Sequence, residues 1–319
     1  MKRVAVLVAL CLVVAGCGLG AGEPTPAGTE LTVSRNFGAD ELGHDTSKTI
    51  PGGETVMRQL QRQFTVETRY GGGFVQEIDG VAGGRRSGRP VDWFYYVNGI
   101  EASEGAASRK LEPGDRVWWD HHDWGAAMRI PAVVGSYPEP FVSGPAGKKI
   151  PIRVECATSA REQCREVRER LEDAGAKVGG IGTLGTRAGP EVLRVLVGTW
   201  SEVRVDPAAR RIEAGPKVSG VFARPAGSGR SLELLDSRGR PARTLGAGAG
   251  LVAATQFVDQ QPTWFVTGTD EIGVSSAAAA LVEARLKDHF AVALENGREV
   301  PLPLPTPAEV EDAVSGTRP

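Results

Sequence analysis

The sequence is poor in the residues and motifs on which many enzymes and metalloproteins depend. Its 319 residues include only four cysteines and four histidines. They contain no nucleophile elbow of the form G-x-S-x-G, no phosphate-binding P-loop, no H-E-x-x-H zinc motif and no S-x-x-K motif. The stretch "LGAGAGL" at 245–251 lacks the third glycine of a dinucleotide-binding fingerprint. We therefore predict a protein that is not an enzyme and uses no cofactor.

An excess of charge of one sign is also missing. The chain has 37 lysines and arginines against 39 aspartates and glutamates, which gives a formal net charge of -2. Nucleic acid is therefore not a predicted partner, because its recognition needs a strongly basic surface. The apolar fraction of 41% and the charged fraction of 24% are those of an ordinary globular protein, long enough here for two domains.

The N-terminus carries the pattern of an export signal. Lys2 and Arg3 precede an apolar run from Val4 to Ala15, which is too short to span a bilayer comfortably. The run ends in "VAGC", which resembles the lipobox of bacterial lipoproteins, where the cysteine receives the lipid. We predict a signal peptide over residues 1–16, a lipid on Cys17, and an extracytoplasmic protein anchored to the cell membrane. An ordinary secretory signal with an incidental cysteine is the alternative.

The remaining cysteines predict a disulfide. Cys11 leaves with the signal peptide and Cys17 carries the lipid, so only Cys156 and Cys164 remain in the folded part, where an exported compartment permits oxidation. Cys156 ends a predicted strand, and Cys164 lies on the inward stripe of the next predicted helix. A bridge between them is within reach. Before this part, the Gly- and Pro-rich residues 17–30 are predicted to be a flexible tether.

Residues 31–128 show the pattern of an α+β domain. An apolar alternation begins at Leu31, and Val56, Met57, Leu60 and Phe64 recur at helical spacing. A hairpin around a Gly-Gly-Gly turn, the aromatic strand "WFYYVNG" and a last strand in "LEPGDRVWW" follow. This order predicts a sheet that packs one face against a helix.

Several motifs in this region occur in a family-specific order. They are Trp93 with "YYVNG" at 95–99, the Gly105-Ala106 step and "LEPGDRVWW" at 111–119. Over about residues 31–124 the chain resembles the transcobalamin C-terminal-like family, a domain of unknown function that is common in bacterial surface lipoproteins and related to the ligand-binding β-grasp folds. The resemblance implies a β-grasp-like domain that binds a ligand. In the vertebrate cobalamin carriers the related domain closes on the corrinoid together with an all-helical domain, and nothing in this chain looks like that partner.

The octet "VWWDHHDW" at 117–124 raises the question of a binding site. Successive strand residues point to opposite faces, so Trp119 and Trp118 lie on different sides of the sheet. One face should be core, while the other is either an exposed aromatic platform for a ligand or is covered by the helix or the neighbouring domain. The candidate ligand contacts are Trp93, Tyr95, Trp118 and Trp119.

The polar centre of the octet offers ligand-type side chains for a metal. Because Asp120, His121, His122 and Asp123 alternate between the two faces, they do not converge on one ion, and we predict no metal site. We predict instead that these residues are solvated at the end of a strand. A pH-sensitive edge remains an alternative, since histidine titrates near neutrality.

The second half of the chain predicts another α+β domain, with a mixed sheet and helices on one face. The Pro- and Gly-rich residues 129–149 are read as a surface linker, residues 150–300 as the domain and residues 301–319 as a Pro-rich tail. Ser159 and Glu162 form a capping-box signature for a helix to about Ala174, and a second helix is predicted over 275–290. The segments "VLVGTWSEVRV" and "WFVTGTDEIGV" look alike, which suggests an internal duplication.

Two hypotheses about function follow. The first is a membrane-anchored, non-catalytic lipoprotein that binds a small molecule, for example a corrinoid-like one, or a partner such as an envelope or transporter protein. The second is a structural or assembly protein of the cell envelope that acts through protein–protein contacts. Asp270, in the Gly-Thr-Asp-Glu run at 268–271, is either part of a polar site or the cap of the next helix.

Overall fold

The aromatic strands form the centre of the first sheet. In this computed structural model, which describes residues 28–186 and 188–310, the sheet has the order β2-β1-β9-β7-β6, and β8 pairs with β7. β1 runs parallel to β9, and the other pairs are antiparallel. The strands are β1 (Thr29–Arg35), β2 (Asp40–Ser47), β6 (Gly84–Arg86), β7 (Arg89–Val97), β8 (Ile100–Glu101) and β9 (Arg116–Asp123).

One helix covers one face of this sheet, as the sequence predicts. Helix α1 (Val56–Gln63) begins where the side chain of Thr55 accepts a hydrogen bond from the amide of Arg58, and it buries Val56, Met57 and Leu60. A small antiparallel sheet lies beside it, formed by β3 (Val66–Arg69), β4 (Phe74–Ile78) and β5 (Val81–Ala82), with the 3-10 turn η1 (Tyr70–Gly72) between β3 and β4. The α+β class and the helix-on-sheet arrangement are confirmed.

The second large sheet is mixed, as predicted. Its order is β11-β10-β12-β17-β16-β18-β19, parallel from β11 to β17 and antiparallel from β17 to β19. The strands are β10 (Ile152–Cys156), β11 (Val178–Thr183), β12 (Leu193–Thr199), β16 (Gly250–Thr255), β17 (Thr263–Gly268), β18 (Ala291–Glu295) and β19 (Arg298–Leu302). A third sheet consists of β13 (Ala223–Ala226), β14 (Ser231–Leu235) and β15 (Pro241–Leu245), with η3 (Gly227–Gly229) after β13.

Helices cover both faces of the second sheet. The prediction of helices on one face only is therefore wrong. The two longest, α2 (Arg161–Asp173) and α6 (Glu271–Ala279), share one core cluster on one face, and α7 (Glu283–Leu286) follows α6. The opposite face carries the shorter α3 (Trp200–Val203) and α4 (Pro207–Glu213), followed by α5 (Pro216–Ser219). The look-alike strands β12 and β17 are parallel neighbours, but their following helices α3 and α6 lie on opposite faces. An internal duplication stays a prediction.

Helix boundaries differ from the prediction at two places. Ser159 does not cap α2; it donates to Glu202, which forms the capping box of α3 with Thr199 instead. The helix predicted over 275–290 ends at Ala279. After it the chain turns and buries Leu281 completely, and the single helical turn of α7 follows. In both cases tertiary contacts override a local pattern that is by itself sound.

The segment 129–149 is not a surface linker. The amide of Val133 donates to the carbonyl of Gly99 in the first half of the chain, and the amide of Val134 donates to the carbonyl of Phe290 in the second half. The 3-10 turn η2 (Pro145–Gly147) follows. The segment is therefore a layer between two bodies, the first built on the sheet of β1 to β9 and the second on the sheet of β10 to β19. Its buried apolar residues include Ile130, Ala132, Val133, Val134, Tyr137 and Phe141.

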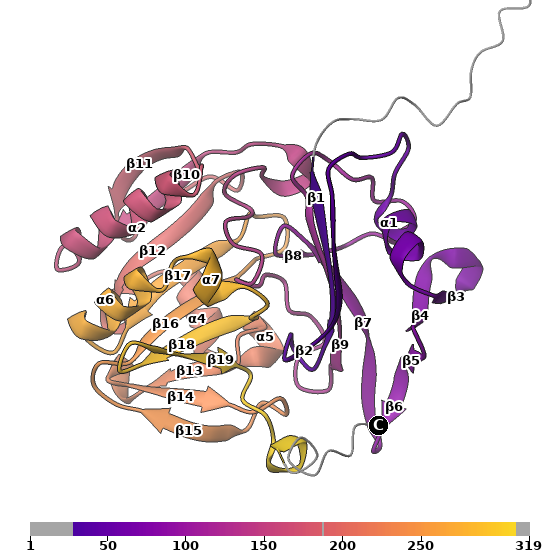
Figure 1. Ribbon diagram of the computed structural model, residues 1–319. Helices are drawn as coiled ribbons and strands as arrows, with labels where there is room; N and C mark the ends of the chain where they lie inside the picture. Colours follow the sequence, from indigo (N-terminus) through magenta and orange to yellow (C-terminus); the bar gives the residue numbers. More distant parts are fainter. Residues whose placement is uncertain (1–27, 187, 311–319) are drawn as a thin grey trace, which may run out of the picture.

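An aromatic core joins the two large sheets. Phe290, just before β18, lies 5.0 Å from Trp118 and 5.6 Å from Tyr96 between ring centroids, and Phe37 lies 5.2 Å from Phe222. These residues belong to one buried cluster that draws on both halves of the chain. Figure 1 shows the first sheet edge-on, with α1 on its right and the second sheet on its left. The first sheet is therefore buried on both faces.

Trp118 tests this shared core. We expect Trp118→Ala to lower the free energy of unfolding by about 3–5 kcal/mol, because loss of the indole would leave an empty space in the core between the two bodies. Urea denaturation followed by circular dichroism measures the loss. Tyr70→Ala is the control, since Tyr70 is 88% exposed and its loss should change stability by less than about 0.5 kcal/mol. A loss for Trp118→Ala as small as that of the control contradicts the shared core.

Candidate functional site

The four predicted aromatic contacts are not an exposed platform. Trp93, Tyr95, Trp118 and Trp119 are all buried, with exposed fractions of 5, 9, 3 and 2%. The structure brings Trp93, Tyr95 and Trp119 together under α1, whereas Trp118 lies on the opposite face in the shared core. Of the two alternatives that the sequence left open, burial under the helix and the neighbouring domain is confirmed. The other alternative, an exposed aromatic platform, is wrong.

The polar residues of the octet are buried as well, so the prediction of a solvated strand end is wrong. The carboxylate of Asp120 accepts hydrogen bonds from the hydroxyl of Ser34 (2.6 Å) and from the amides of Phe37 (3.1 Å) and Gly38 (2.9 Å). It also lies 2.8 Å from Nδ1 of His122. Asp120 is fully buried, and this set of partners compensates for the desolvation of its charge.

The turn that Asp120 holds has an unusual backbone. Asn36, Phe37 and Gly38 are three successive residues with positive φ, at 57°, 61° and 84°. Asn and Gly tolerate this region, but for a bulky residue such as Phe it is an outlier. Asp120 fixes two of the three amides, and the ring of Phe37 then stacks on His122 at 4.6 Å. The network is architectural, since it fixes the turn between β1 and β2 against β9.

The same network does not form a nucleophile and its base. Ser34 accepts from Nε1 of Trp118 (2.8 Å) and donates to Asp120. In the part of the chain that the structure describes, no hydrogen bond joins Ser34 to His122. Among residues 28–186 and 188–310 there is also no group of three or more His, Cys, Asp or Glu side chains placed to hold a metal ion.

His121 points to the other face, toward α1 and the small sheet. Its Nε2 lies 3.1 Å from the carbonyl oxygen of Ala82, and its ring lies 5.1 Å from that of Trp93. Burial, with a smaller contribution from the positive charge of Arg86, lowers the pKa of His121 from 6.5 to about 4. His121 is therefore neutral at physiological pH.

The predicted disulfide is present between Cys156 and Cys164, whose Cα atoms lie 6.1 Å apart. It joins the end of β10 to the inward face of α2, as expected. Next to it lies an open pocket of about 590 Å³ that Arg153, Arg161 and Thr183 help to line. The predicted lipid site, Cys17, lies outside the described residues. No helix among the described residues has both the length and the apolar character needed to cross a membrane.

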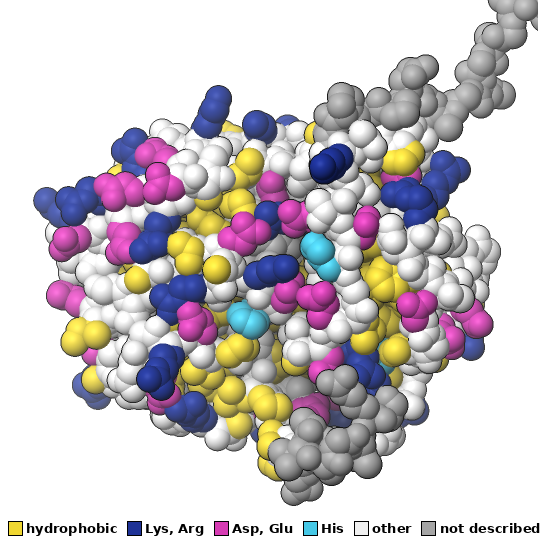
Figure 2. Space-filling model, in the orientation of Figure 1, with side chains coloured by type: hydrophobic (Ala, Val, Ile, Leu, Met, Phe, Trp, Pro, Cys, Tyr) yellow, Lys and Arg dark blue, Asp and Glu magenta, His cyan; other side chains and the backbone are white. Residues whose placement is uncertain are grey.

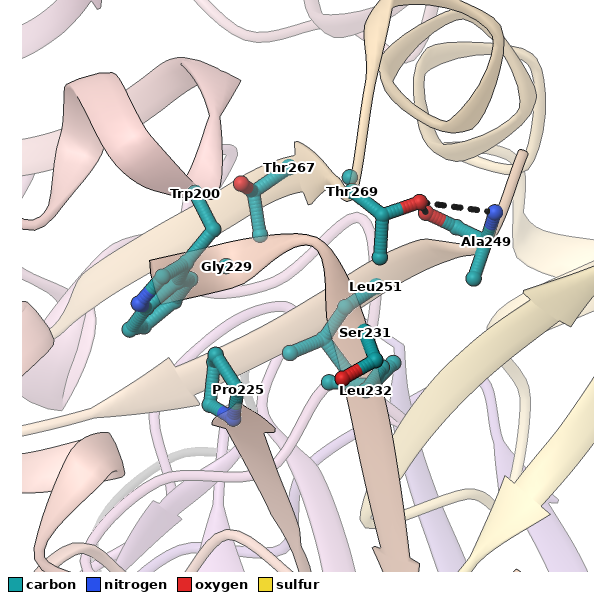
Figure 3. Close-up of a pocket in the computed structure, with 10 residues that line it drawn as sticks. Trp200, Pro225, Gly229, Ser231, Leu232, Ala249, Leu251, Thr267 and Thr269 are labelled. Carbon is teal, nitrogen blue, oxygen red and sulfur yellow. Dashed lines mark hydrogen bonds between the residues drawn. The ribbon is translucent and has the colours of Figure 1, made fainter. Parts of the chain in front are cut away.

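Asp270 is a helix cap. Its carboxylate accepts from the amide of Gly273 (2.9 Å) at the start of α6 and from the amide of Gly248 (2.7 Å). Next to it lies a small hollow that is lined by Trp200, Thr267 and Thr269, among others (Figure 3). There the hydroxyl of Thr269 accepts a hydrogen bond from the amide of Ala249. The hollow measures about 10 Å³, which is at most the space of one water molecule. It is too small for a ligand.

A further cavity, larger than this hollow but smaller than the open pocket beside the disulfide, lies where the two bodies meet. It measures about 430 Å³, and its walls come from residues 100–103, residues 128–131, helices α4 and α5, and the loop 256–259 between β16 and β17. Sequence reasoning missed this site because its walls are far apart along the chain. Residues that line it include Glu101, Met128, Arg129, Arg211, Lys217 and Phe257.

The rest of the surface shows no concentration of charge on the face drawn in Figure 2, where basic and acidic side chains are interspersed. Many of them are paired, for example Arg285 with Glu299 and Arg224 with Glu233. This agrees with the nearly balanced composition. We take the cavity between the two bodies as the candidate site, because its walls come from both halves of the chain and carry apolar and charged side chains together.

Comparisons with known proteins relate only part of the chain to others. A family model described as "Domain of unknown function (DUF4430)" matches residues 53–123, within the region that resembles the transcobalamin C-terminal-like family. No curated protein matches the chain. Haptocorrin, solved in complex with Cbi, is 16% identical with a TM-score of 0.24, over 31% of this chain and 26% of that chain. A candidate metal binding protein from Ruminococcus gnavus ATCC 29149 is 11% identical with a TM-score of 0.23, over 30% of this chain and 97% of that chain. This chain thus spans about a quarter of haptocorrin.

The lowered pKa of His121 predicts an acid-sensitive fold. Because the pKa is about 4 in the folded protein and near 6.5 in the unfolded chain, the unfolded state binds more protons between these values. The contribution of His121 to stability is fully present above pH 6.5 and is lost as the pH falls toward 4. Between pH 7 and pH 4.5 the wild type should lose about 2–3 kcal/mol more than His121→Asn does.

Urea denaturation at the two pH values measures this difference. The control is His44→Asn, which makes the same substitution at an exposed position on the edge strand β2. Equal pH dependence of the wild type and His121→Asn contradicts the prediction.

Proposed function

We propose that the protein is a non-catalytic, extracytoplasmic lipoprotein, anchored to the membrane by a lipid on Cys17, that binds a small molecule in the cavity between its two bodies. The observation that supports binding is the cavity itself. Its volume of about 430 Å³ falls within the range of roughly 300–1,000 Å³ that is usual for small-molecule sites. Such sites also occur preferentially where two structural units meet.

The lining of the cavity supports the same proposal. It combines apolar side chains with five charged ones, so it can contact both the apolar and the charged parts of a ligand. Met128 and Val258 are 66 and 78% exposed there, so apolar surface faces solvent at the cavity. A corrinoid-like molecule is one ligand to test.

The proposal of a non-catalytic protein is supported by what the chemically capable side chains do. Asp120 fixes a turn, Asp270 caps a helix, and His121 contacts a backbone carbonyl oxygen. Each of these contacts is structural.

The alternative is an envelope protein that acts through protein–protein contacts, with an envelope or transporter protein as its partner. Ile272 and Val205 favour it, because they are 70 and 57% exposed away from the cavity. They are, however, single residues, and isolated apolar side chains on a surface are common.

The anchor is tested by Cys17→Ser. We expect this variant to leave the membrane fraction or to accumulate as uncleaved precursor, because serine cannot receive the thioether-linked lipid. Fractionation followed by mass spectrometry of the N-terminus measures both outcomes, with Cys11→Ser as the control. Membrane association and processing like those of the wild type would show that Cys17 is not the anchor.

The cavity is tested by a ligand screen that includes corrinoids. A ligand of the cavity should raise the Tm of the detergent-extracted full chain in a thermal shift assay, because it binds only the folded state. Ser103→Trp, which places a large ring at the cavity wall, should abolish the shift. Ser108→Trp is the control on the same exposed loop, outside the cavity. A ligand whose shift survives Ser103→Trp binds elsewhere.

A further inference from the structure

Arg211 presents an uncompensated charge to the cavity. Its side chain is half-buried. Among the described residues, no carboxylate lies within salt-bridge distance of the guanidinium, and its Nε is buried without a hydrogen-bond partner. One terminal nitrogen donates to the carbonyl of Val218. Burial without an acidic neighbour lowers the pKa of Arg211 from its ordinary value, although arginine stays charged at any physiological pH.

The position of the guanidinium is fixed by an aromatic ring. Its central carbon lies 4.8 Å from the centroid of Phe257, within the range of a cation–π contact. Phe257 belongs to the loop after β16, while Arg211 belongs to α4, so the contact joins two walls of the cavity. Because Nε is buried, the donors that remain for a ligand are those of the two terminal nitrogens.

The other charges at the cavity do not neutralise Arg211. Glu101 pairs with Arg129 at 3.2 Å, so these two compensate each other. Lys217 adds a further cation, and Asp259 adds the remaining carboxylate, on an exposed loop. With three cations against two carboxylates, the lining has a net positive charge, to which Arg211 contributes the charge that is least hydrated.

We propose that the cavity binds a small amphipathic anion, with its carboxylate or phosphate head on Arg211 and its flat apolar body against Phe257 and Met128. This rests on the proposed binding function and names the chemical class of the ligand. An oxyanion fits because the planar guanidinium offers two parallel donors to it. The apolar body fits because Phe257 and the exposed Met128 supply a soft, polarisable surface beside the head group.

The experiment compares three probes that share one ring system. They are 2-naphthoate, 2-naphthyl phosphate and the uncharged 2-naphthamide. Binding to the detergent-extracted full chain is measured by isothermal titration calorimetry, with a detergent blank for each probe. We expect at least one of the two anions to bind, and to bind about tenfold or more tightly than the amide, since a charge-assisted hydrogen bond contributes about 1.5–3 kcal/mol. The two anions compared with each other distinguish a carboxylate ligand from a phosphate ligand.

Variants at the cavity locate the effect. Arg211→Gln should weaken the bound anion about tenfold or more and leave the amide unchanged. Arg211→Lys, which keeps the charge but loses the planar donors, should retain part of the affinity. Arg210→Gln is the matched control, because Arg210 is the exposed neighbour on the same helix and does not line the cavity. Thermal melts establish that each variant is folded.

The outcomes separate this inference from the proposed function. Equal binding of anion and amide, or an anion affinity that Arg211→Gln leaves unchanged, overturns the inference, and so does the absence of anion binding at millimolar concentration. The binding function survives these results if an uncharged ligand from the screen binds and is blocked by Ser103→Trp. It fails with the inference only if no ligand of any charge is blocked by that variant.

Discussion

The first sheet must be covered on both faces, and this constraint decides the role of its aromatic strands. Strand β9 places Trp119 under helix α1 and Trp118 against Phe290 of the second body. A sheet that has large aromatic side chains on both faces is stable in water only if both faces are buried. The segment 129–149 and the second sheet therefore cover the face of the first sheet that helix α1 leaves open. The chain behaves as one packed unit at this interface.

Burial on both faces also explains the polar residues of β9. An aspartate in the centre of such an interface is costly unless its charge is compensated, and Asp120 has four partners within 3.1 Å. Three of them, at Ser34, Phe37 and Gly38, belong to β1 or to the turn after it. The network therefore fixes the turn that carries Phe37 into the shared core. What looks in the sequence like a cluster of metal ligands is a device for joining two layers.

The sequence predicts features that depend on neighbouring residues and misses those that depend on distant ones. The spacing of Val56, Met57 and Leu60 correctly predicts α1, and the positions of Cys156 and Cys164 correctly predict the disulfide. Strand β2 was missed because an exposed edge strand such as "DELGHDTS" needs no apolar alternation. The predicted tail wrongly begins at residue 301, inside β19. Pro301 and Pro303 made this segment look irregular in the sequence, although β19 pairs with β18. The cover of Trp118 could not be foreseen, because Phe290 lies 172 residues further along the chain.

The cavity was likewise invisible in the sequence, and a comparison of two half-buried arginines shows how Arg211 differs from a structural charge. Arg194 makes two hydrogen bonds of 2.9 and 2.8 Å to Glu155 and a further one to Asp206, so its charge is used within the fold. Arg211 has a carbonyl and an aromatic ring in place of carboxylates among the described residues. The charge of Arg194 is thus neutralised by carboxylates of the chain, whereas that of Arg211 is not. This difference supports the proposed role of Arg211 as a contact for an anionic ligand.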